Sequence, residues 1–142
     1  MKTDSDRPLD AKDSGVYFAP SSPVWLQKKA LAAGLAWFNL DLARVNSKKR
    51  LLAVCQQEFD FPETFGANWD ALADYLQDFS WWRAEGYVIN VTHAAHFARA
   101  APQDFSLLLE ILDYAARYWK QKGRIFIVLI DHQPRGMLLP TL

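Results

Sequence analysis

The sequence predicts an α/β fold, in which a small three-stranded parallel sheet is flanked by four to five helices. Three nearly unbroken apolar runs, residues 35–40, 86–92 and 124–130, are typical of parallel strands that are buried on both faces. Segments with helical periodicity separate these runs, which favours right-handed crossovers between parallel strands. The chain has 142 residues, 51% of them hydrophobic, so one domain is long enough to bury a sizeable core.

The first part of the chain divides into a tail and an extension of the domain (15–34). Residues 1–14 are polar and charged, and we expect them to be disordered. Residues 15–20 form a short β-prone run that ends at a proline, which is typical of an edge strand or of a segment laid over the core. A serine before Pro23 begins a helix, and Gly34 ends it.

Four further helices are predicted after the first long strand. They cover about 48–58, a short stretch from 69, 94–100 and 102–122. Ser47 and Pro102 mark two of the starts, and Gly123 ends the last helix. Residues 132–142 contain two prolines and a glycine and look like a C-terminal tail, which leaves a single domain over 15–131.

The charges are unevenly distributed. The chain as a whole has a formal net charge of zero, so no bulk basic character indicates a nucleic-acid partner. Residues 56–86 nevertheless hold seven acids and one base, a net charge of −6, so the rest of the chain carries +6. The acids are Glu58, Asp60, Glu63, Asp70, Asp74, Asp78 and Glu85, and the base is Arg83. Such segregation favours electrostatically steered association.

Several classes of function are disfavoured. The single cysteine, Cys55, excludes an internal disulfide framework and a multi-cysteine metal site, and it fits a reducing compartment such as the cytoplasm. The first residues lack the apolar stretch of a signal peptide, and no run approaches the roughly 18 apolar residues that cross a membrane. The glycine motifs of P-loops and dinucleotide sites are absent, so we expect no cofactor.

Two possible reactive groups have simpler interpretations. His93 and His96 are three residues apart and could share a helix face as metal ligands, but no third ligand lies nearby, so we expect no metal. Cys55 lies in the apolar register of its helix, which indicates a small buried residue rather than a nucleophile.

An acidic helix organises the site prediction. Asn68 is a good N-cap residue, and the residues at helical spacing that should face inward are Trp69, Leu72, Ala73 and Leu76. Asp70, Asp74 and Asp78 recur every fourth residue on one outer face, with neighbours about 6 Å apart, where like charges repel. Such a face suggests a positively charged partner. Two alternatives are ordinary solvated charges and a general acid–base pair of Asp70 and Asp74, for which no cleft is evident.

Aromatic residues are dense around this helix. They are Phe61, Phe65, Trp69, Phe79, Trp81 and Trp82. Trp81 and Trp82 are adjacent in a loop and cannot easily both be buried. An exposed tryptophan beside carboxylates is typical of a protein interface. Single-strand nucleic-acid binding would need basic residues among the aromatics, and the charges here have the opposite sign.

The stretch from Phe61 to Asp74 resembles the signature of the barstar family. The matching positions are Pro62, Phe65, Gly66, Asn68, Trp69, Asp70, Ala71, Leu72 and Asp74, and a looser similarity extends from about 35 to 130. The family comprises small intracellular inhibitors of microbial ribonucleases of the barnase type, with a three-stranded parallel sheet surrounded by helices. The resemblance therefore implies a cytoplasmic inhibitor without cofactor or catalytic residues. We expect it to be a monomer until it meets a basic, extracellular-type ribonuclease.

The resemblance also implies roles for individual residues. The loop and acidic helix would fill the ribonuclease active site, with Asp74 as the central mimic of an RNA phosphate and Asp70 as the second. Gly66 and Asn68 would shape the loop, and Trp69 would pack against or touch the partner. The implied partner-binding residues are Thr64, Phe65, Gly66, Asn68, Trp69, Asp70, Ala73, Asp74 and Tyr118.

The chain departs from the family pattern at the rim of this surface. Thr64 stands where the family has an aromatic lid, Ala73 and Phe79 stand where tryptophans would be, and Tyr118 replaces a further contacting acid. These changes favour the same mode of binding with a different partner ribonuclease. The alternative is a barstar-like interaction module for some other basic protein.

Overall fold

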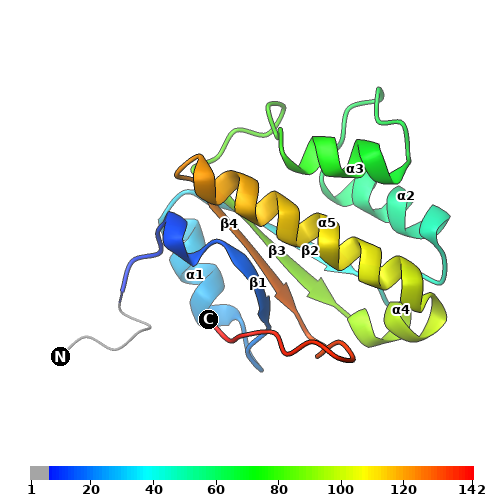
Figure 1. Cartoon of the computed structure of the whole chain (residues 1–142). Helices are drawn as coiled ribbons and strands as arrows, with labels where there is room; N and C mark the ends of the chain where they lie inside the picture. The colour runs from blue at the N-terminus through cyan, green and yellow to red at the C-terminus, as the bar shows by residue number, and fades with distance from the viewer. Residues whose placement is uncertain (1–6) are drawn as a thin grey trace.

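A computed structural model describes residues 7–142 and confirms the predicted α/β class, with one strand more than expected. The strands are β1 (Gly15–Phe18), β2 (Leu35–Asp41), β3 (Gly86–Thr92) and β4 (Ile125–Ile130). They form one sheet in the order β1-β4-β3-β2, and every neighbouring pair is parallel (Figure 1). The predicted number of three strands is wrong because β1 is a fourth. The sequence of residues 15–20, a short β-prone run before a proline, is compatible with both an edge strand and a segment laid over the core.

Five α-helices accompany the sheet in the described part of the chain, as predicted. They are α1 (Val24–Ala32), α2 (Lys48–Glu58), α3 (Trp69–Leu76), α4 (Ala94–Ala100) and α5 (Pro102–Gln121). A short 3₁₀ helix, η2 (Ala11–Asp13), precedes β1. Figure 1 shows α1 on one face of the sheet and the other four helices on the opposite face. None of the helices in residues 7–142 has both the length and the apolar character needed to cross a membrane.

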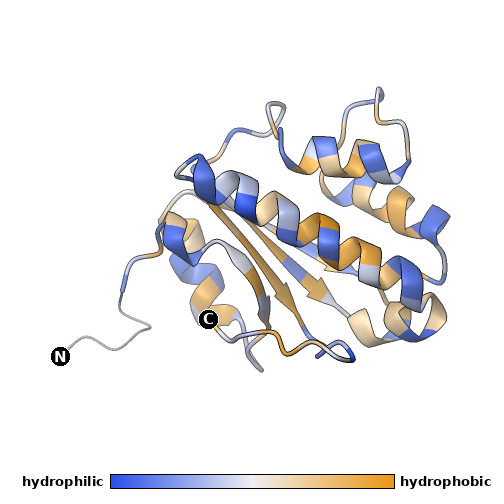
Figure 2. Ribbon diagram, viewed as in Figure 1, coloured by the Kyte–Doolittle hydropathy of each residue, from blue (hydrophilic) through white to orange (hydrophobic). Residues whose placement is uncertain are grey.

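The sheet is buried on both faces. On the α1 side, a small core consists of Leu26, Ala30, Leu35, Val88, Ile127 and Leu129. On the other side, alternate residues such as Phe38, Ile89 and Phe126 join a larger core with the remaining helices. Figure 2 shows the apolar character of the strands and the polar outer faces of the helices. The two-sided burial explains why β4 is an unbroken apolar run and β3 a nearly unbroken one, interrupted by the buried Asn90.

The segment before β1 is more ordered than expected. Arg7 donates two hydrogen bonds to the Asp13 carboxylate, at 2.7 and 3.0 Å. Ser14 Oγ donates to the Arg124 carbonyl and accepts from the Phe126 amide, which ties the segment to β4. Residues 7–14 are therefore ordered, in contrast to the expected disordered tail. The remaining residues of that tail, 1–6, lie outside the described part of the chain. The composition could not reveal partners that lie more than 100 residues away.

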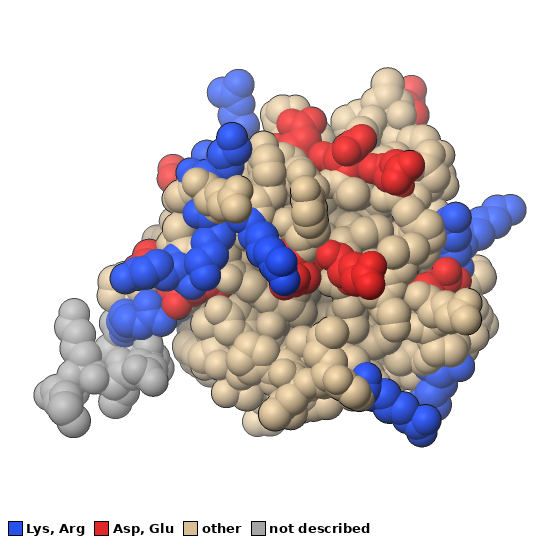
Figure 3. All heavy atoms as spheres, in the orientation of Figure 1, with Lys and Arg blue, Asp and Glu red and all other residues tan. Residues whose placement is uncertain are grey.

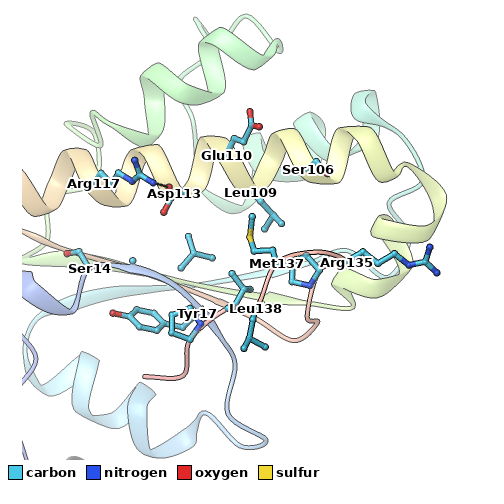
Figure 4. A pocket seen from close by; sticks show the side chains of 15 residues that line it. Ser14, Tyr17, Ser106, Leu109, Glu110, Asp113, Arg117, Arg135, Met137 and Leu138 are labelled. Carbon is cyan, nitrogen blue, oxygen red and sulfur yellow. Dashed lines mark ion pairs between the residues drawn. The ribbon is translucent and has the colours of Figure 1, made fainter.

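The last residues pack beside β1, and together with β1 and α5 they line a pocket (Figure 4). The Phe18 amide donates to the Pro140 carbonyl at 2.8 Å, and Phe18 and Thr141 form a parallel bridge. The Gln133 side chain bonds both the amide and the carbonyl of Leu139, whose side chain is only 7% exposed. The segment that the sequence presents as a tail is thus held at the edge of the sheet. The division of the chain at residues 15 and 131 stays a prediction.

Candidate functional site

Helix α3 begins where the sequence predicts. Asn68 Oδ1 accepts a hydrogen bond from the Ala71 amide at 2.8 Å, which satisfies one of the free amides at the helix start. Leu72 and Leu76 are fully buried and fix one side of the helix to the core. At its other end, Trp119 Nε1 on α5 donates to the Leu76 carbonyl at 2.8 Å. The helix is therefore held at both ends with its opposite face turned to solvent.

That outer face is acidic. Asp70 and Asp74 are exposed on α3, whereas Asp78, expected on the same helix face, is exposed two residues after the helix ends at Leu76. Figure 3 shows acidic side chains gathered over α3. Within residues 7–142, none of the three has a cationic partner closer than 4.0 Å. Asp78 accepts a hydrogen bond from the Ser80 amide at 3.3 Å, so part of its carboxylate is already engaged. Asp70 and Asp74 are thus the carboxylates most available to cations from outside the chain.

The loop before α3 is tied to the helix by side chains. The Thr64 and Tyr75 hydroxyls share a hydrogen bond of 2.7 Å, and the Phe65 amide donates to the Pro62 carbonyl at 2.9 Å. Tyr75 did not belong to the predicted site. Its position two helical turns after the N-cap residue puts it on the loop side of the helix, and that spacing was the signal that could have identified it.

The left-handed residue of the loop is Ala67 rather than Gly66, the glycine that the resemblance expects to shape the loop. Gly66 does not have a positive φ, whereas Ala67 does, at 51°. A Cβ atom on Gly66 would lie 3.1 Å from Asn68 Nδ2, so this glycine leaves room for the capping side chain. Ala67 holds the left-handed conformation at a cost on the order of 1 kcal/mol. The loop is therefore shaped by a strained alanine and a cap rather than by a flexible glycine.

An aromatic cluster supports the loop from below. The rings of Phe61 and Phe65, each 6% exposed, are 4.7 Å apart, and Tyr75 packs against both at 5.3 and 5.4 Å. Trp81 is half-buried against Phe61, with its Nε1 donating to the Phe59 carbonyl at 3.0 Å. Its neighbour Trp82 is 39% exposed, in agreement with the expectation that the pair is not buried together.

The remaining predicted residues lie around α3. Trp69 is half-buried, and Lys48 Nζ lies 5.6 Å from the centroid of its ring. Ala73 is half-buried against the core. Tyr118 comes from α5, the neighbouring helix, and Lys122 Nζ lies 5.5 Å from its ring. The predicted residues that are exposed together along the loop and α3 are Thr64, Gly66, Asn68, Asp70 and Asp74. Phe65, by contrast, is buried beneath the loop, and Tyr118 belongs to a separate helix.

The other candidate groups have structural partners. His93 Nδ1 bonds Asp41 Oδ1 at 2.7 Å, and His96 Nε2 bonds Asn46 Oδ1. The described residues contain no group of three or more side chains that could hold a metal ion. Cys55 is 1% exposed, and burial raises the pKa of its thiol to about 12, so the reactive thiolate is scarce at neutral pH.

Comparison with known protein families places this surface in context. The family model described as Barstar (barnase inhibitor) matches residues 35–131, from the start of β2 to the residue after β4. A comparison with individually curated proteins finds no match. The matched region includes the acidic helix and its loop, whereas β1, α1 and the last eleven residues lie outside it.

Proposed function

The chain belongs to the barstar family, and we propose that it inhibits a basic ribonuclease of the barnase type by filling the enzyme's active site. Members of this family are inhibitors rather than enzymes. The observation that carries the proposal is the exposure of Asp70 and Asp74, one helical turn apart, with no cation among residues 7–142 within ion-pair distance of either. An inhibitor of a phosphate-binding enzyme needs such free carboxylates.

The proposed mechanism is mimicry of RNA phosphates. Asp74 occupies the central position and Asp70 the second, and cationic side chains of the enzyme donate charge-assisted hydrogen bonds to both. The position of Asp70 in the first turn of α3 is favoured by the helix dipole. Because the Asn68 cap and the buried leucines hold the helix in place, little conformational freedom is lost on binding.

The loop and the flanking helix supply the rim of the proposed interface. The full proposed set is Thr64, Phe65, Gly66, Asn68, Trp69, Asp70, Ala73, Asp74 and Tyr118. Thr64 is engaged by Tyr75 and holds the loop in one shape, where the family pattern has an aromatic lid. This difference favours a partner ribonuclease other than the family's best-known enzyme.

The acidic segment also steers association. The net charge of −6 over residues 56–86 attracts a basic enzyme from a distance and speeds encounter at low salt. This expectation is inherited from the family, since the complex of barnase with barstar is itself the standard example of charge-steered binding. We further propose that the protein acts in the cytoplasm and is a monomer before it binds the enzyme.

The decisive experiment is to titrate barnase-type ribonucleases with the purified protein at two salt concentrations. Inhibition should be tight and its association rate should fall with salt. Asp74→Ala should weaken binding by about 2 kcal/mol or more, a range already known for the family's own complex. Asp78→Ala, which removes the same charge two residues after the end of α3, is the matched control and should change affinity far less. Full inhibition by Asp74→Ala would refute the mechanism.

The second candidate is a module that binds a different basic protein. The changed rim at Thr64, Ala73 and Tyr118 favours it, because these positions adapt the surface to a new partner. Recovery of a nuclease from the native host in a pull-down supports inhibition. Recovery of another basic protein, released by Asp74→Ala, supports the second candidate.

A further inference from the structure

A cluster of positive charge lies at the start of α2. Arg44, Lys48, Lys49 and Arg50, which we call the basic cluster, fall within seven residues that contain no acid. All four side chains are exposed. Over the described range 7–142, none of them forms an ion pair within 4.0 Å. The cluster therefore presents four exposed cations without a carboxylate partner in that range, and Lys48 among them lies against the Trp69 ring.

The stability of α2 does not explain the cluster. Three of the four cations occupy the first turn of the helix, where the dipole favours negative charge, and the first turn contains no acid. Ser47 Oγ accepts from the Arg50 amide at 3.2 Å, so the helix start is already capped without them. Cations that work against their own helix point to a partner outside the chain.

The basic cluster adjoins the acidic helix. Lys48 Nζ lies 5.6 Å from the Trp69 ring, and Trp69 is the first residue of α3. Figure 3 shows basic side chains at the right-hand edge of the molecule, where α2 begins in Figure 1, beside the acidic row over α3. Positive and negative charge thus meet at the N-terminal ends of the two helices.

We propose that the basic cluster is the second half of the binding surface, and that the partner ribonuclease carries carboxylates beside its cationic active site. This inference rests on the proposed function. A uniformly basic enzyme that docked on Asp70 and Asp74 would be repelled by four adjacent cations. Carboxylates on the enzyme, placed opposite the basic cluster, turn the repulsion into attraction and fix the rotational orientation of the two proteins in the complex. The cluster thereby rejects basic ribonucleases that lack them.

An alternative ligand for the cluster is RNA itself. Single-strand binding combines cations with exposed aromatic faces. The aromatic ring next to the cluster, Trp69, is half-buried and already lies against Lys48. The neighbouring carboxylates of α3 would also repel a phosphate backbone. These contacts favour a protein partner over RNA.

The test is a charge reversal, Lys49→Glu with Arg50→Glu, which leaves the Lys48–Trp69 contact intact. Barnase-type ribonucleases that the wild-type protein inhibits are the probes. The matched control is Lys12→Glu with Lys28→Glu, an equal change of net charge at two exposed sites on η2 and α1. Added negative charge alone speeds association with a basic enzyme. We expect the α2 double variant to associate about tenfold more slowly nonetheless, and the control to bind as fast as wild type or faster.

The outcomes separate this inference from the proposed function. If the α2 variant binds as wild type or faster while Asp74→Ala still weakens binding, the inference is wrong and the proposed function stands. If Asp74→Ala binds as wild type, both fail. RNA binding by the wild-type protein that the α2 variant loses would also overturn the inference. If the inference is right, replacing Asp or Glu residues beside the enzyme's active site by Lys should restore binding of the α2 variant. This rescue is the coupling that a double-mutant cycle measures between residues in contact.

Discussion

The hydroxyl groups of Thr64 and Tyr75 lie 2.7 Å apart, so one hydrogen bond joins the loop before α3 to the last turn of the same helix. Tyr75 also packs against Phe61 and Phe65, which support the loop from below. A single residue thus holds both the surface and the base of the loop.

Tyr75→Phe should keep the ring packing and remove only the hydrogen bond. We expect the free energy of unfolding to fall by about 0.5–1.5 kcal/mol and dissociation from a ribonuclease to become faster, because the loop is less preorganised. Urea unfolding and a dissociation rate measure the two effects. Tyr114→Phe on α5, where the side chain is 64% exposed, is the control and should change neither. An unchanged dissociation rate for Tyr75→Phe would show that the bond does not shape the binding loop.

Ala67→Gly should stabilise the protein by up to about 1 kcal/mol, because Ala67 has a φ of 51° that glycine adopts without strain. Ala53→Gly makes the same chemical change at an exposed position within α2 and should destabilise by about 0.5–1 kcal/mol. Denaturant unfolding of both variants gives the comparison. Destabilisation by both substitutions would contradict the left-handed conformation of residue 67.

Gly66→Ala should disturb the cap of α3, since the new Cβ atom would lie 3.1 Å from Asn68 Nδ2. Asn68→Ala alone should cost about 1 kcal/mol of stability. If crowding of the cap is the reason for the effect at Gly66, the two costs are not additive, and Gly66→Ala should do little in the Asn68→Ala background. Unfolding of the two single variants and the double variant tests this, and simple additivity would point to another cause.

Asp13 should make stability depend on acidic pH. Burial raises the pKa of its carboxyl, but hydrogen bonds from Arg7 and from the Asp10 amide, together with the Arg7 charge, outweigh this and hold the pKa below its ordinary value of 3.8. A lowered folded-state pKa contributes stability that is present above the unfolded pKa and lost as pH falls through the folded one. The stability gap between wild type and Asp13→Asn should therefore be larger at neutral pH than at about pH 2.5. A gap that stays constant over this range would contradict the lowered pKa.

Cys55 should resist thiol reagents in the folded protein. Its burial and its raised pKa of about 12 leave little thiolate at neutral pH. Modification by an alkylating reagent should follow opening of the structure, and it should become rapid once the protein is unfolded in urea. Equal rates in the folded and unfolded protein would place the thiol at the surface.

Local signals in the sequence identified most of the elements. The starts and ends of α2, β3 and α4 agree with the predicted ranges, because each is marked by a cap, a glycine or a change of periodicity close by. The exposed positions of Asp70 and Asp74 also follow from helical spacing alone.

Features that depend on distant partners could not be predicted. Strand β1 is only four residues long and pairs with β4, more than 100 residues later. The order of the segment before it depends on Ser14 meeting Arg124 and Phe126. Within the site, Ala67 has a positive φ, and an alanine gives no local sign of a left-handed conformation.

The hydrogen bond from Phe18 to Pro140 has a consequence for self-association. The outer strand of a sheet offers unpaired amides and carbonyls on which a second chain can polymerise. Here that strand is short, and the protein's own C-terminal segment occupies its far end. The last residues therefore cover part of the β1 edge and hinder addition of a second copy's strand there, while β2 forms the opposite edge of the sheet. Protection of this edge suits a protein whose proposed task requires it to stay dissolved and ready for its enzyme.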